Sequence, residues 1–172
     1  MKKIILIIML LLGFTFGLLA QNVKLAYIDS NRIMTECNDT KEAQELFQQD
    51  RANWDKQIDD LTAEIQRLET EYETRKLTLS ETGKKEAEAR ITEKLKERQT
   101  QLENIYGEDG LAARRNAELL APIMEKLRAI IDRVAIDENY AMIFDIAAGS
   151  VLWAKPNMDI TQQLIVEMNK VE

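Results

Sequence analysis

Residues 39–138 place apolar side chains at alternating steps of four and three residues. The first series is Phe47, Trp54, Ile58, Leu61, Ile65, Leu68, Tyr72 and Leu79, interrupted by Arg51 and Arg75. A sustained period of 3.5 residues keeps one apolar stripe turned toward a partner helix, as a coiled coil requires. A helix of roughly 40 residues is about 60 Å long, too long for the core of a small globular domain. The segment therefore predicts a long helix that needs a second helix beside it.

This pattern breaks at residues 80–84, where Gly83 lies between hydroxyl residues and Lys84. Glycine and hydroxyl residues between two periodic segments are typical of a turn. A second apolar series follows, made of Ile91, Leu95, Leu102, Ile105, Ala112, Leu119, Ile123, Ile130 and Val134. A short connection favours antiparallel neighbours, so the two stripes are expected to face each other. We expect one helical hairpin over residues 39–138, with its tip near residues 80–84.

The returning half of this hairpin contains three residues that disfavour a helix. Gly107 and Gly110 each cost about 1 kcal/mol relative to alanine. Pro122 removes one backbone hydrogen bond and clashes with the preceding turn. We expect bends at these hinge candidates, or a frayed segment from Tyr106 to Leu111, in an arm that flexes.

Strand-like sequence precedes the hairpin. Residues 23–29 are rich in strand formers and alternate apolar with less apolar side chains, which predicts a strand. Asp29 or Ser30 can then cap a short helix over residues 32–36. The long helix is expected to begin at Asp39, because Glu42 follows three residues later in a pattern close to a capping box.

Strand-like sequence also follows the hairpin. Residues 140–146 and 150–154 predict the two strands of a β-hairpin around residues 147–149. Asp159, with Gln162 three residues later, is expected to cap a closing helix. A sheet this small needs added strands or a covering surface, which another copy of the chain can supply. The expected fold is α+β, a long antiparallel coiled-coil hairpin projecting from a small β-sheet body built from residues 21–38 and 139–172.

The first 20 residues have the composition of an export signal. Lys2 and Lys3 form a basic start, residues 4–19 are mostly apolar, and Ala20 precedes the polar Gln21. This order predicts a secretory signal peptide cleaved between Ala20 and Gln21. The alternative is an uncleaved membrane anchor, because the apolar run approaches the length that spans a bilayer.

Composition argues against several classes of function. The chain has no histidine, which removes the usual general base, the Ser-His and Cys-His nucleophile pairs and histidine metal sites. Cys37 is the single cysteine, and no phosphate-binding glycine motif or G-x-S-x-G sequence occurs. Removing two lysines with the signal leaves 21 basic against 30 acidic residues, a net charge of −9 that opposes nucleic-acid binding. We therefore expect no enzyme, no catalytic residues, no cofactor and no metal.

Several short motifs occur in a characteristic order. They are Lys24-Leu25-Ala26-Tyr27-Ile28-Asp29, Leu120-Ala121-Pro122-Ile123, Ile130-Ile131-Asp132-Arg133-Val134-Ala135, Tyr140 through Asp145, Val151-Leu152-Trp153-Ala154 and Asp159-Ile160-Thr161. With the signal peptide and the charged hairpin, this order resembles the Skp family of OmpH-like periplasmic chaperones. The resemblance implies a homotrimer with a small β body and three helical arms around a cavity. It also implies ATP-independent holding of unfolded outer-membrane β-barrel proteins. The best-known members are basic, whereas this mature chain is acidic.

The resemblance identifies no single contact residue, so the candidates come from the sequence pattern. Apolar residues outside the two stripes are candidates for a client-facing surface: Leu46, Leu77, Tyr106, Leu111, Met124 and Leu127. The alternative for them, especially for the last two, is packing at the root of the hairpin. The strand residues Leu25, Tyr27, Ile143, Phe144, Leu152 and Trp153 are the candidates for contacts between copies in the body.

The hairpin tip is less acidic than the rest of the chain. Residues 73–98 hold eight basic and six acidic side chains. The basic candidates are Arg75, Lys76, Lys84, Lys85, Arg90 and Lys94. Such a tip can steer acidic clients or touch anionic lipid headgroups, although mixed charges on a helix are commonly a solvated face. The alternative function for the whole chain is an exported coiled-coil spacer or scaffold of the cell envelope that binds one folded partner.

Overall fold

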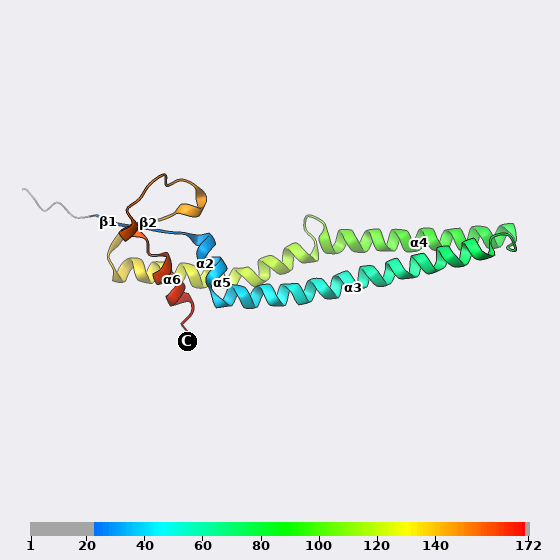
Figure 1. Cartoon of the computed structure of the whole chain (residues 1–172), viewed down its shortest axis with the longest axis horizontal. Coiled ribbons are helices and arrows are strands. Elements are labelled where there is room, and N and C mark those ends of the chain that lie inside the picture. Colours follow the sequence, from blue (N-terminus) through cyan, green and yellow to red (C-terminus); the bar gives the residue numbers. More distant parts are fainter. Residues whose placement is uncertain (1–22, 171–172) are drawn as a thin grey trace, which may run out of the picture.

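A computed structural model describes residues 23–170, so the predicted cleavage site between Ala20 and Gln21 lies outside the described residues. The molecule is elongated, with a small body at one end and a long helical arm (Figure 1). Strand β1 (Lys24–Ile28) and helix α2 (Ser30–Glu36) belong to the body. This arrangement confirms the α+β class and the projecting hairpin.

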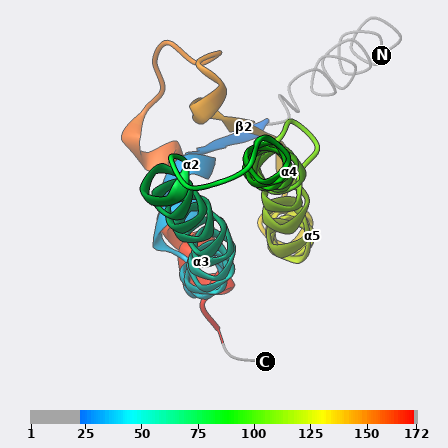
Figure 2. The same ribbon diagram turned by 90° about the vertical axis from the view of Figure 1, so that its right-hand side faces the viewer.

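Three helices build the arm. Helix α3 (Asn38–Arg75) runs outward, and α4 (Glu81–Tyr106) and α5 (Leu111–Asp137) return. Seen along the arm, α3 lies beside the limb formed by α4 and α5 (Figure 2). The predicted cap at Asp39 is wrong, because α3 begins at Asn38 after Cys37, which makes no side-chain capping bond. The carboxylate of Asp39 instead accepts a hydrogen bond from Lys126 Nζ at 2.8 Å.

The turn at the tip lies four residues before the predicted position. Helix α3 ends at Arg75, and residues 76–80 form the turn. Ser80 then caps α4, because its Oγ accepts the backbone N–H of Gly83 at 3.1 Å. Gly83 and Lys84 therefore belong to the first turn of a helix, and the prediction of a tip centred on residues 80–84 is wrong.

The returning limb breaks where its glycines predicted. Helix α4 ends at Tyr106 and α5 starts at Leu111, with residues 107–110 outside both helices. A Cβ at Gly107 would lie 2.4 Å from the carbonyl oxygen of Glu103, so this loop requires glycine there. Pro122 lies inside α5, which continues past it, so the proline does not end the helix. The role of these residues as hinges remains a prediction.

The body contains a two-stranded parallel sheet. Strand β2 (Tyr140–Asp145) pairs with β1, with Leu25 opposite Met142 and Ile28 opposite Asp145. Parallel strands need a crossover connection, and here the whole arm is that connection. Asp29 caps α2 as expected, because its carboxylate accepts the backbone N–H of Arg32 at 3.1 Å.

The predicted β-hairpin after the arm does not form. A short 3₁₀ helix, η1 (Ile146–Ala148), follows β2 and ends at Gly149 in the left-handed region, with φ of 72°. Residues 150–154 contain no strand, although their sequence favours one. Part of the free edge of β1 is taken by the segment after η2 (Pro156–Met158), because Ile160 N–H donates to the Tyr27 carbonyl at 3.0 Å. Within one chain, residues 150–154 therefore pair with neither strand.

The closing helix α6 (Thr161–Met168) forms, but its predicted capping box does not. Asp159 accepts the backbone N–H of Thr161 at 2.8 Å, and Ile160 occupies the N-cap position. The side chain of Gln162 accepts a hydrogen bond from Arg32 at 2.6 Å and so ties α6 to α2. The contact between the two ends of the chain has replaced the local one.

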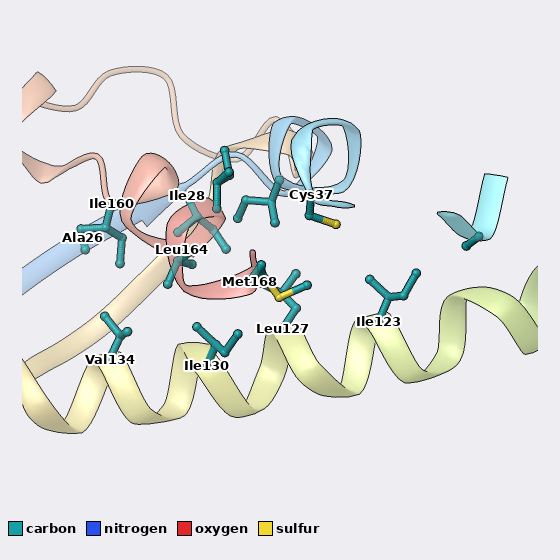
Figure 3. Close-up of a cluster of buried hydrophobic side chains, with 13 residues drawn as sticks. Ala26, Ile28, Cys37, Ile123, Leu127, Ile130, Val134, Ile160, Leu164 and Met168 are labelled. Atoms are coloured by element: carbon teal, nitrogen blue, oxygen red, sulfur yellow. The ribbon is translucent and has the colours of Figure 1, made fainter. Parts of the chain in front are cut away.

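One apolar core joins β1, α2, α5 and α6 (Figure 3). Its buried residues are Ala26, Ile28, Ile33, Cys37, Ala43, Ile123, Leu127, Ile130, Val134, Ile160, Leu164, Ile165 and Met168. The second half of α5 is thus part of the body as well as of the arm. This core anchors the root of the hairpin.

Candidate binding surfaces

The outer face of the body carries an open apolar groove. Successive residues of β1 alternate, so Ala26 and Ile28 are buried while Leu25 and Tyr27 are half-buried on the other face. Residues 150–155 cross over this face and enclose a groove of about 640 Å³. It is lined by Leu25, Ala26, Tyr27, Phe144, Ser150, Val151, Leu152, Trp153, Ala154, Lys155 and Met158. Five of the six predicted body residues therefore meet at one site, whereas Ile143 packs against the core.

Two of these groove residues are strongly exposed. Leu152 is 98% and Trp153 is 78% accessible to solvent, although both are large and apolar. Soluble monomers rarely leave such residues clustered in the open, and such patches mark interaction surfaces. Met142 and Ile136 are exposed nearby on β2 and α5 and escaped the sequence prediction. The alternation along β2 would have indicated Met142, which lies two residues before Phe144.

The outer part of the arm is held by polar contacts between α3 and α4. Lys94 Nζ lies 3.2 Å from a Glu64 carboxylate oxygen, and Gln101 donates to Gln57 at 3.1 Å. Two tyrosines extend the row, with Tyr72 donating to Glu88 and Tyr106 donating to Asp55. Of the described apolar residues in the outer arm, those that are buried are Ile65, Leu68 and Ile105. The apolar seam is therefore thin.

These contacts perturb both tyrosine hydroxyls. The hydrogen bond to the Glu88 carboxylate raises the pKa of Tyr72 above its usual value of 10.0. Burial and the bond to Asp55 raise the pKa of Tyr106 in the same direction. Both hydroxyls therefore remain protonated donors at neutral pH, and the latches between the helices stay closed.

The client-facing candidates divide into exposed and buried residues. Leu77 at the tip is 93% exposed, and Leu46, Leu111 and Met124 are each about 40% exposed along the limbs. Tyr106 is similarly exposed, but its hydroxyl is engaged by α3. Leu127 is 3% exposed within the core, so its assignment to a client-facing surface is wrong and the packing alternative holds.

Most of the basic candidates at the tip are paired with neighbouring carboxylates. Arg75 contacts Glu71 at 3.1 Å, Lys84 contacts Glu81 at 2.8 Å, and Lys76 contacts Glu73. Lys94 lies between Glu64 and Glu97. Lys85 and Arg90 form no ion pair with any described residue. Pairing therefore cancels much of the positive charge with which the tip would steer an anionic partner.

The described residues 23–170 include no cluster of histidine, cysteine and carboxylate side chains that could hold a metal ion. Within the same residues, no helix has the length and apolar character needed to cross a membrane.

A long helical hairpin on a small two-stranded body, with an open apolar groove, defines the class of arm-bearing α+β proteins. Residues 24–168 match the family model described as "Outer membrane protein (OmpH-like)", and the chain belongs to this OmpH-like family. The resemblance inferred from the sequence is thereby confirmed.

One solved structure has the same fold over most of its length. It is the crystal structure of a proposed outer membrane chaperone (OmpH-like) from Caulobacter crescentus CB15. The TM-score is 0.76 at 15% sequence identity, with 86% of this chain and 84% of that chain covered. At this identity the likeness shows the fold. No curated protein matches the chain.

Proposed function

We propose that the chain is an ATP-independent holdase chaperone of the periplasm, which binds unfolded outer-membrane β-barrel proteins and prevents their aggregation. Its membership of the OmpH-like family supports this proposal. The observation that carries it is the combination of an open apolar groove on the body with a long arm that bears scattered exposed apolar residues.

The groove supports assembly as a homotrimer. Leu152 and Trp153 are exposed in a single chain, and covering them with another copy removes apolar area from water at about 25 cal/mol per Å². Assembly at the body would place three arms around a shared cavity. The segment 150–154, which has strand-forming sequence but no strand partner, lies where a neighbouring copy can supply one.

The arms are suited to weak and distributed binding. An unfolded β-barrel protein exposes apolar strands whose edges would otherwise pair and aggregate. Leu46, Leu77, Leu111 and Met124 offer separate apolar contacts along one arm. Several weak contacts on neighbouring arms raise the effective concentration, so capture needs no single strong site. Release needs no ATP, because a client that folds into the membrane buries the surface that the arms held.

The proposal includes export with cleavage after Ala20, as the basic and apolar composition of residues 1–20 supports. Peripheral contact of the tip with anionic membranes belongs to the same proposal. Leu77 and the unpaired Lys85 and Arg90 support that contact, whereas the ion pairs at the tip weaken it.

The test measures the mass of chain 21–172 by light scattering after gel filtration. The same sample is then mixed with an outer-membrane β-barrel protein diluted from urea, and turbidity is followed without nucleotide. We expect a trimer that suppresses aggregation, with no change when ATP is added. A monomer or dimer that leaves the turbidity unchanged contradicts the proposal and favours the scaffold alternative.

Matched variants connect the two measurements. Leu152→Ser combined with Trp153→Ser is expected to yield monomers and to abolish the suppression of aggregation. Ile136→Ser changes a residue that is 79% exposed on α5 but does not line the groove, so it is expected to behave as the unchanged chain. Equal behaviour of the groove variant and the unchanged chain would remove the groove from the proposal.

A further inference from the structure

The two limbs of the arm differ in length by seven residues. On the outer arm, Gln57 contacts Gln101 and Glu64 contacts Lys94, so both limbs advance seven residues between these contacts. The next cross-contact toward the body joins Asp50 to Arg115 at 2.8 Å. From Gln57 to Asp50 α3 again advances seven residues, but from Gln101 to Arg115 the returning limb advances fourteen. The returning limb therefore holds one additional heptad.

This additional heptad is taken up around residues 107–110. The loop bulges away from the arm while α3 runs past it without interruption (Figure 1). The bulge depends on its glycines, because a Cβ at Gly107 or Gly110 would lie 2.4 Å or 2.5 Å from a backbone carbonyl oxygen. A side chain at either position would thus oppose the bulged conformation.

A surplus of one heptad has a particular consequence. Sliding α4 along α3 by seven residues returns each side chain to the same kind of position, because the pattern repeats with that period. Lys94 would move from Glu64 to Glu71, and Gln101 would move from Gln57 to Glu64. Both donors meet a carboxylate in the second register. The charged flanks therefore accept either alignment.

The tip carries a second glycine that the observed register does not require. A Cβ at Gly83 would make ordinary contacts of 3.4 Å with Leu79 and Ser80, and its φ is not positive. A slide of seven residues moves the middle of the hairpin by half that amount, from the turn at 76–80 toward residues 80–84. Gly83 would then lie in the turn, and Leu79 would continue the apolar stripe of α3. This is the turn that the heptad pattern alone predicts.

We propose that the outer arm has two registers one heptad apart, and that the bulge at residues 107–110 stores the residues for the second. In the second register the bulge winds into helix and α4 slides about 10 Å along α3, at 1.5 Å per residue. The arm lengthens by half of that slide, or about 5 Å. The contacts that hold the observed register are mostly exposed polar pairs over a thin seam, which are individually weak. One-turn slides between packed helices are an established form of switching.

The test uses cysteine pairs in chain 21–172 carrying Cys37→Ala. Each pair contains Lys94→Cys, combined with Glu64→Cys for the observed register or Glu71→Cys for the second. Gln57→Cys with Lys94→Cys is the matched control, one heptad away in the direction that the bulge cannot supply. A short bismaleimide links the thiols, and the mass of the denatured product separates links within one chain from links between chains.

We expect the Glu64 pair to link fastest and the Glu71 pair to link at least tenfold faster than the Gln57 control. Gly107→Ala with Gly110→Ala opposes the bulge and should shift the product from the Glu64 pair to the Glu71 pair. Gly83→Ala is tolerated in the observed register and should reduce linking of the Glu71 pair alone. Circular dichroism identifies any variant that has lost helix. Equal rates for the Glu71 and Gln57 pairs in all folded backgrounds would overturn the proposal, because local unfolding alone produces that result.

Discussion

Leu127 and Met124 lie one turn apart on α5, yet the structure gives them opposite environments. Leu127 is 3% exposed in the core beside Met168 of α6, whereas Met124 is 42% exposed (Figure 3). Truncating a fully buried leucine to alanine costs about 2.7 to 5.0 kcal/mol. For a chain of this size each kcal/mol lowers Tm by about 2 to 4 °C, so Leu127→Ala is expected to lower Tm by roughly 5 to 20 °C. Met124→Ala removes a half-exposed side chain and should cost about 1 kcal/mol or less.

The assay is thermal unfolding followed by circular dichroism, at one fixed protein concentration because assembly makes Tm depend on concentration. A second readout is the client aggregation assay, at a temperature where both variants are folded. There Met124→Ala is expected to weaken the suppression of aggregation, and Leu127→Ala is not. A Tm for Leu127→Ala within about 2 °C of that for Met124→Ala would refute the packing of α6 on α5.

Two further predictions concern the carboxylates of the body. Asp29→Ala removes the cap of α2 and should cost about 1 kcal/mol, measured by urea unfolding, whereas Asp29→Asn should keep most of that stability. Burial raises the pKa of Asp145, but hydrogen bonds from Ser30 and Ala147 outweigh it and leave the pKa below the usual 3.8. A lowered folded-state pKa adds stability above the unfolded value that is lost as the pH falls through the folded value. Asp145→Asn should therefore reduce the fall in Tm between about pH 6 and about pH 3, and an unchanged fall would contradict this account.

The sequence predicts the arm well, because the heptad pattern and helix-breaking glycines are local signals. The strand at the start, the cap at Asp29 and the break at Gly107 and Gly110 all occur where expected. The tip does not, because two signals compete there. Gly83 marks a break, but the Ser80 side chain caps α4 and draws Gly83 into the helix. Sequence alone does not decide between such alternatives when their free energies are close.

The missing second strand has a different cause. Residues 150–154 have strand-forming sequence, but a strand also needs a free edge to pair with. Gly149 turns the chain away from β2, and Ile160 takes part of the edge of β1. Which edge remains free depends on contacts between residues more than a hundred positions apart, and local propensity carries no information about these. The same argument explains why the groove could be predicted only as a set of body residues.

The polar construction of the outer arm also follows from the proposed function. A seam rich in large apolar residues would hold α3 and α4 more firmly but would leave the long helices prone to pair with other copies along their length. Exposed pairs such as Glu64 with Lys94 contribute about 1 kcal/mol or less each, yet they keep the arm soluble while its tip is unpaired. Apolar residues can then lie outside the seam at wide intervals, as Leu46, Leu77 and Leu111 do, without forming one continuous sticky face. An arm of this kind contacts an unfolded chain at several points and still releases it, because each contact is weak on its own.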